Sequence, residues 1–380
     1  MSITPNPEII SWAMQRAGKT VEDLTSLSKH AEKWLTGEKT PTVKQLQKIA
    51  DKTHVPLAYF YGISTPKMTL QIPDYRTTYN GSAEYPSPEL YETINLMQTR
   101  QDWLDSFLDD MEAEQLDFVG SCADKKDANE VANIIEGILD LKPGWAHRLQ
   151  SDEAVRHLRK VIEAKGVYTC TGSYFHHNSR PYNVEEFRGF VLASKRAPII
   201  FINTRDSKSA QLFTLLHEFA HLLFNESGVD DMVYEVPEKE ELCDSVAARV
   251  LVPTPLVYKI FNQMSGEKAI DELRHITKAS ELACLRRAHE LNCINKDDYF
   301  RIYKNYKSQF EITPTSTSTQ GTGSGSNYYT LKKSALGKLF VETVFEGVKS
   351  ERLLYRDAYD LTDMKASSFE KFYKREGMLL

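Results

Sequence analysis

The residues best suited to chemistry form a His-Glu-x-x-His pattern. His217, Glu218 and His221 supply it, inside an apolar run of helical length at residues 214–223. Four residues make about one helical turn, so both imidazoles lie on one face and can reach a single Zn²⁺. Glu218 lies next to that face, where its carboxylate can take a proton from a metal-activated water. The pattern therefore predicts a hydrolytic zinc site with Glu218 as general base.

A hydrolytic zinc site needs a third protein ligand, and a second predicted helix at residues 240–251 can supply it. Glu240 and Asp244 share one face of that helix, which ends before Pro253. We expect Glu240 to be the third ligand and Asp244 to accept the second ring N–H of a ligating histidine. Two alternatives stay open. Glu241 could be the ligand instead, or the acidic residues could simply be a solvated helix start that favours the helix dipole.

The elements that must position this site are first helices and then strands along the chain. Residues 131–165 follow a helical period, and strands begin after Gly166. The clearest strands are residues 190–193 and 199–202, with Lys195-Arg196 between them at a hairpin tip. A small sheet beside many helices predicts an α+β, mostly helical fold.

Three segments before and within the zinc helix resemble the ImmA/IrrE family of metallo-endopeptidases. They are FRGFVL (187–192), APIIFINT (197–204) and QLFTLLHEFAH (211–221). The second helix is similar to that family's Glu-x-x-Ala-Asn-x-Phe-Ala-Ala-x-Leu-Met-Pro segment. Here Cys243, Asp244 and Val246 replace its alanine, asparagine and phenylalanine.

The resemblance implies a thermolysin-like (gluzincin) core that depends on Zn²⁺ and is tied to regulated cleavage of a repressor. Asp244 brings the second helix closer to the Glu-x-x-x-Asp of thermolysin-like peptidases. In such folds an exposed strand before the zinc helix aligns the peptide substrate by strand addition. Residues 199–203 are our candidate for that strand.

The first 62 residues form a separate predicted unit. Residues 34–50, WLTGEKTPTVKQLQKIA, resemble the Trp-Glu-x-Gly-x-x-x-Pro-Thr segment of XRE-type helix-turn-helix domains. Such domains place the recognition helix before this tryptophan, and residues 26–33 leave it little room. The candidate DNA contacts are Lys29, His30 and Lys33, with Lys39 and Lys44 on phosphates.

The charge of this unit leaves its function open. Residues 1–62 hold eight Lys/Arg and six Asp/Glu, a net charge of only +2. Because neutralisation of DNA phosphates dominates the affinity for DNA, a net charge of +2 is only weak support for DNA binding. The unit is therefore either a sequence-specific DNA reader or a docking module for a protein partner or for the peptidase itself.

The remainder of the chain divides by composition. The long helix that follows Pro88 carries an apolar stripe from Leu90 to Met111, which we expect to pack in the core. Residues 263–312 are winged-helix-like, and Arg286-Arg287 there could read DNA or the segment could sense a partner. The expected domains are 1–62 (helix-turn-helix), 63–125 (connector and helix), 126–262 (zinc metallopeptidase), 263–312 (helical subdomain), 313–327 (low-complexity linker) and 328–380 (C-terminal helical unit).

Composition indicates an intracellular protein. The 380 residues are 41% hydrophobic and 26% charged, which fits a globular chain with more than one domain. No apolar run reaches membrane-spanning length, and no signal peptide is recognisable. Five scattered cysteines without C-x-x-C spacing favour reduced thiols in the cytoplasm. A net charge of −6 argues against a chain whose whole surface is built for nucleic acid.

Two classes of function follow from these features. The first is a zinc endopeptidase that cleaves a transcriptional repressor or an antitoxin-like regulator. The second is a non-hydrolytic regulator or antitoxin of a toxin–antitoxin-like pair, in which the metallo-fold is a scaffold for a protein partner. A retained general base favours the first class, because a scaffold needs none. The loop with Tyr174, His176 and His177 is either an oxyanion donor or plain solvated loop.

Overall fold

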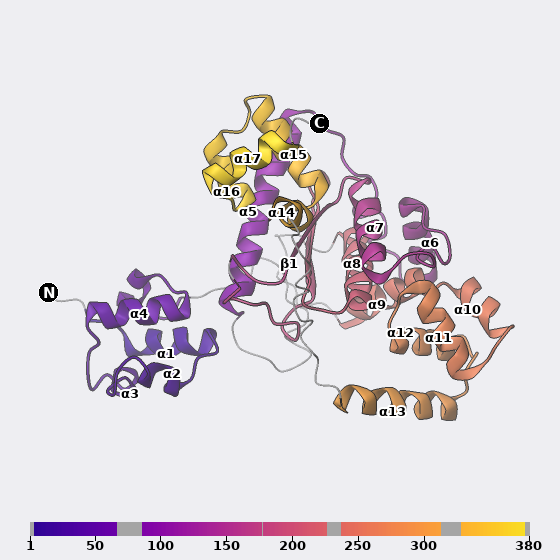
Figure 1. The fold of residues 1–380 in the computed structure, drawn as a ribbon, viewed down its shortest axis with the longest axis horizontal. Coiled ribbons are helices and arrows are strands. Elements are labelled where there is room, and N and C mark those ends of the chain that lie inside the picture. Colours follow the sequence, from indigo (N-terminus) through magenta and orange to yellow (C-terminus); the bar gives the residue numbers. More distant parts are fainter. Residues whose placement is uncertain (1–3, 67–85, 177, 226–236, 313–327, 377–380) are drawn as a thin grey trace. The chain divides into compact units, whose positions relative to one another are not determined.

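The computed structural model describes residues 4–66, 86–176, 178–225, 237–312 and 328–376. In this part the chain is mostly helical with one three-stranded sheet, which confirms the predicted α+β class (Figure 1). Two compact units are formed, residues 1–95 and 96–380. The expected linker at 313–327 lies outside the described residues. Over the described ranges, no helix is both long and apolar enough to cross a membrane.

Unit 1 is a set of short helices around its own apolar core. Ile9 and Ile10 are fully buried, and Trp34 and Phe60 pack into the same cluster. Trp34 lies within α3, a single turn of four residues, and the residues between α2 and α3 form turns, so the crowding inferred for residues 26–33 is present in the structure. The elements are α1 (Pro7–Arg16), α2 (Val21–Thr25), α3 (Glu32–Leu35), α4 (Val43–Thr53) and the 3-10 helix η1 (Leu57–Tyr61).

The sheet of unit 2 has the order β1-β3-β2, with β1 (Tyr168–Gly172), β2 (Gly189–Leu192) and β3 (Ile199–Asn203). Strand β3 pairs in parallel with β1 and antiparallel with β2, and all five of its residues are buried. The expectation that residues 199–203 form an exposed strand is therefore wrong. Both of its edges are already hydrogen-bonded, and its near-continuous apolar sequence is typical of a central strand.

Helices cover the sheet and build the main core. Helix α8 (Lys208–Phe224) follows β3 directly, and the Ser207 hydroxyl caps it by accepting from the backbone N–H of Ala210 at 3.2 Å. Helix α9 (Pro237–Leu251) packs along α8 (Figure 1). The other helices here are α6 (Ala128–Leu139), α7 (Ser151–Glu163), α10 (Thr254–Phe261), α11 (Gly266–Thr277), α12 (Glu281–Glu290) and α13 (Lys296–Ile312).

Gly189 of β2 allows α8 to approach the sheet closely. A Cβ at this position would lie 2.6 Å from Cγ2 of Thr214 in α8 and 2.7 Å from the carbonyl oxygen of Phe201 in β3. Both distances are far below van der Waals contact. A side chain at residue 189 would therefore push α8 away from the sheet.

The C-terminal helices cover the outer edge of β1. They lie beside α5 (Pro88–Asp110), whose residues from Leu96 onward belong to unit 2 (Figure 1). The thiol of Cys170 in β1 donates to the carbonyl of Leu336 at 3.4 Å. These helices are α14 (Tyr328–Leu336), α15 (Lys338–Lys349), α16 (Tyr355–Thr362) and α17 (Ala366–Glu376).

A buried polar network fixes the start of α15 to α7 and β1. Glu163 Oε2 accepts the backbone N–H groups of Lys338 and Leu339 at 3.1 and 3.3 Å, which caps the helix. Arg159, which is 9% exposed, donates to the backbone carbonyl of Thr169 at 3.0 Å. Gly337 has a φ of +85°, and a Cβ there would lie 2.3 Å from the same carbonyl. Only glycine fits this junction.

Candidate metal centre

Three side chains from two helices converge on one point. His217 and His221 lie one turn apart on α8, and Glu240 lies in the first turn of α9. The two Nε2 atoms are 3.0 Å apart. Glu240 places Oε2 at 3.2 Å from Nε2 of His217 and Oε1 at 3.2 Å from Nε2 of His221. Among the described residues, this is the only group of three or more His, Cys, Asp or Glu side chains arranged to hold a metal ion.

These separations fit a tetrahedral zinc site. With Zn–N distances of about 2.0–2.1 Å, two tetrahedral ligand atoms should lie about 3.3 Å apart. The three measured separations are 3.0, 3.2 and 3.2 Å. Two imidazoles and a carboxylate are also a common donor set for catalytic zinc, which keeps a fourth position for water or substrate. The residues present therefore fit the metal.

The side chains of both histidines are almost completely buried, so only neighbouring protein groups can orient their rings. His217 is 3% and His221 is 4% exposed. The second ring nitrogen of His217, Nδ1, lies 2.9 Å from Oδ1 of Asp244. Asp244 stands one turn after Glu240 on α9. It is thus placed as the expected outer carboxylate, which would fix the orientation of a ligating imidazole.

The local charges keep Glu240 ionised. Burial alone would raise the pKa of Glu240, but its contacts with His217 and His221 hold that pKa well below the usual range for a glutamate. Burial likewise lowers the pKa of His217, but Asp244 and Glu240 outweigh it and raise that pKa. The donor set therefore carries a carboxylate anion, which favours a divalent cation between the three side chains.

Glu218 and Glu241 occupy different environments. Glu218 is 4% exposed on α8, and its negative charge contributes to raising the pKa of the adjacent His217. Glu241 is exposed and lies outside the group that converges on the metal position. The structure thus brings Glu240, and not Glu241, to the two histidines, and it keeps Glu218 within the same buried region.

The remaining sequence candidates lie elsewhere. His176 Nδ1 lies 2.9 Å from Oδ1 of Asp363, so this side chain contacts the C-terminal helices. Arg287 is 2% exposed and cannot read DNA, whereas its neighbour Arg286 is exposed. The proposed DNA contacts on unit 1 are all exposed, and Lys33 pairs with Glu38 at 3.3 Å; they are Lys29, His30, Lys33, Lys39 and Lys44.

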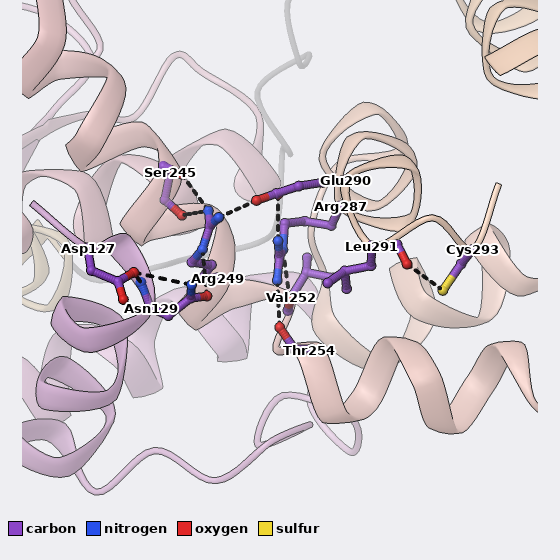
Figure 2. A network of polar contacts seen from close by, with 10 residues as sticks. All are labelled: Asp127, Asn129, Ser245, Arg249, Val252, Thr254, Arg287, Glu290, Leu291 and Cys293. Carbon is purple, nitrogen blue, oxygen red and sulfur yellow. Dashed lines mark hydrogen bonds and ion pairs between the residues drawn. The ribbon is translucent and has the colours of Figure 1, made fainter. Parts of the chain in front are cut away.

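Arg287 instead belongs to a polar network at the far end of α9 (Figure 2). Its guanidinium donates to the carbonyl of Val252 at 3.3 Å and to Oγ1 of Thr254 at 2.9 Å. Glu290 of α12 accepts from both Arg287 and Arg249 of α9. The network fixes the end of the helix that carries Glu240. This network is not visible in the sequence, where two adjacent arginines are typical of a basic surface.

Arg249 extends the same network to a third helix. Its Nε donates to Oδ1 of Asn129 in α6 at 2.9 Å, and its Nη1 donates to the carbonyl of Ser245 at 3.0 Å (Figure 2). The arginine side chains therefore tie α6, α9 and α12 together near the C-terminal end of α9.

Comparison with known families agrees with this geometry. Residues 336–375 match a domain of unknown function (DUF8813). No curated protein shows significant similarity to the chain. Residues 173–289, which include α8, α9 and the three converging side chains, match the peptidase family model described as IrrE N-terminal-like domain, and this match supports the ImmA/IrrE family for this part of the chain.

Proposed function

We propose that this protein is a zinc-dependent endopeptidase that acts on a protein partner. The observation that carries the proposal is the convergence of His217, His221 and Glu240 at separations that suit tetrahedral zinc, within a region that matches a peptidase family. His217, His221 and Glu240 would hold the metal. When bound, Zn²⁺ would act as a Lewis acid toward the scissile carbonyl.

The chain's own residues would carry the proton transfers. Glu218 is buried and adjacent to a ligand, so it can accept a proton from the attacking water and return it to the leaving amine. Asp244 would orient His217 through Nδ1. Cleavage by a metal-activated water needs no covalent intermediate with the protein.

The partner that we propose is a transcriptional repressor or an antitoxin-like regulator, selected by parts of the chain outside the metal centre. Unit 1 would contribute to this selection either by binding DNA near the partner or by docking the partner itself. The single-turn α3 supports docking, because one turn of helix offers few side chains to a major groove.

The substitution Glu218→Gln tests catalysis directly. It keeps the size of the side chain, and the three proposed ligands are unchanged. Loss of a general base alone costs roughly 10²–10⁴ in rate. We expect Glu218→Gln to keep its zinc and its partner while cleavage of the partner is lost by that factor. The matched control is Glu241→Gln on the exposed face of α9, which should cleave at the parent rate.

A different result would favour the non-hydrolytic alternative. If Glu218→Gln has the same biological effect as the parent chain and the partner stays intact in both, then catalysis is not the purpose of this site. The metallo-fold would in that case be a scaffold for binding a partner.

A further inference from the structure

Phe213 differs from its neighbours on α8. Every other residue from Gln211 to Phe224 is buried, whereas the Phe213 side chain is only half-buried. It therefore marks the line on α8 where the interior of the protein meets solvent. Phe213 also lies four residues, or about one helical turn, before the proposed ligand His217.

The ring of Phe213 lies beside the ring of His217. Their centroids are 6.2 Å apart, and the two ring planes are inclined by 31°. Helical side chains lean toward the N-terminus of their helix, so an imidazole at residue 217 leans over the turn that carries residue 213. The contact thus follows from the spacing of the two residues on one helix.

Other protein groups enclose the imidazole of His217 on its remaining sides. The ring of His221 lies 4.7 Å away, measured between centroids, on the next turn of α8. Glu240 lies 3.2 Å from Nε2, and Asp244 lies 2.9 Å from Nδ1. With these neighbours in place, His217 is 3% exposed. Phe213 supplies an apolar wall of this enclosure.

The contact between His217 and Asp244 depends on how much water reaches it. The Asp244 side chain is 62% exposed, so one partner of the contact is largely in water. Contacts between solvated charged groups contribute little because water screens them, and the same contact is stronger where the surroundings exclude water. The groups that keep water away from the imidazole therefore decide how firmly Asp244 can hold the ring.

We propose that Phe213 is a positioning residue of the metal centre. Its ring keeps water away from the imidazole of His217, which strengthens the hold of Asp244 on Nδ1 and keeps Nε2 directed at the metal position. The hydrophobic shell around a metal site controls the access of solvent to that site. The inference rests on the proposed zinc site and does not depend on catalysis there, because it concerns how tightly the metal is held.

The zinc affinity of the full-length chain tests the proposal, measured by competition with a chromophoric zinc chelator. Phe213→Ala opens one side of the imidazole and should weaken zinc binding about 10-fold, the lower end of the range for partners outside the ligand shell. Phe213→Leu keeps an apolar wall and should stay within about 3-fold of the parent. The control is Phe300→Ala on α13, where the phenylalanine is 55% exposed, and it should bind zinc as the parent does.

A double substitution separates positioning from a purely structural role. Asp244→Ala alone should weaken zinc binding about 10-fold or more. If Phe213 acts through the contact of Asp244 with His217, adding Phe213→Ala should cost at least about 3-fold less than the product of the two separate losses, because both changes remove the same contact. If Phe213 only supports the fold of α8, the two losses multiply.

A second variant keeps the test valid if Phe213→Ala does not fold. Phe213→Gln retains a long side chain but is polar, so it should lose about as much zinc affinity as the alanine variant. Thermal unfolding of the zinc-free proteins checks that each variant keeps the fold.

Three results would overturn the proposal. They are zinc affinity equal to the parent's in both Phe213→Ala and Phe213→Gln, losses that multiply in the double variant, and a loss in Phe300→Ala equal to that in Phe213→Ala. A parent chain that binds no zinc would remove the proposed zinc site and the role of Phe213 together. That failure appears in the parent, whereas a failure of the Phe213 inference alone appears only in the variants, so the two are distinguishable.

Discussion

Replacing Gly189 by alanine should disturb both the stability of unit 2 and the metal centre. The added Cβ would lie 2.6 Å from Cγ2 of Thr214 and 2.7 Å from the carbonyl oxygen of Phe201. Thr214 is 2% exposed, and the Phe201 carbonyl belongs to the backbone of the central strand, so neither can move freely. Overpacking of this kind typically costs about 1–3 kcal/mol of unfolding free energy.

The expected change can be measured by thermal unfolding. For large domains each kcal/mol corresponds to roughly 2–4 °C, so Gly189→Ala should lower the melting temperature by about 2–12 °C. The matched control is Gly137→Ala in α6, where an added Cβ has no atom within 4 Å. That substitution should instead stabilise the helix by about 0.5–1 kcal/mol.

Thr214 lies less than one turn before His217, so displacement of α8 should reach the metal ligands. We expect Gly189→Ala to bind zinc more weakly than the parent in a competition titration with a chelator. Adding Thr214→Ser removes the contacting Cγ2 and should restore part of the lost stability, seen as coupling in a double-mutant cycle. A Gly189→Ala protein with the parent's melting temperature and zinc affinity would refute this account of the α8 packing.

Four further outcomes are expected. His221→Ala should lose most of its zinc by metal analysis while Glu241→Ala keeps it, and the reverse result would move the third ligand away from Glu240. Removing zinc with a chelator should lower the melting temperature, and added Zn²⁺ should restore it, because ligand binding stabilises only the folded chain; no change would argue against a bound metal. Arg287→Ala should cost at least about 2 kcal/mol of unfolding free energy, because it breaks a buried hydrogen-bonded pair, whereas the exposed Arg286→Ala should stay within about 0.5 kcal/mol. Burial raises the pKa of Cys284 to about 12, so in the native protein an alkylating agent should modify the half-buried Cys293 first and leave Cys284 unmodified until unfolding.

Local sequence patterns were sufficient for the parts of the site that lie on single helices. The spacing of His217 and His221, and of Glu240 and Asp244, fixes which side chains share a helical face, and the structure brings these faces together. The convergence of these side chains depends on the packing of α8 against α9. That packing was predicted from the family resemblance and not from the spacing of the residues. The choice between Glu240 and Glu241 needed the rotation of α9, which sequence alone leaves open.

Properties that depend on the neighbours of an element were less accessible. Residues 199–203 read as a strand, but whether a strand is central or at an edge is decided by elements far away in sequence. Arg287 was predicted to lie on a basic surface because two of its hydrogen-bond partners, Val252 and Thr254, are more than thirty residues away in the sequence. The end of the α5 stripe was predicted to be core because Met111 is apolar, but Met111 is 45% exposed in the structure.

The junction at Gly337 bears on how this chain could have evolved. The family match covers residues 173–289, yet the outer edge of its sheet is closed by β1 and by helices that begin after residue 327. A recombination event that moved only the matched segment to another gene would carry an uncovered sheet without the Glu163 cap and the Gly337 turn. The unit that can be inherited intact is therefore larger than the matched peptidase segment, and we expect α7, β1 and the C-terminal helices to be gained or lost together.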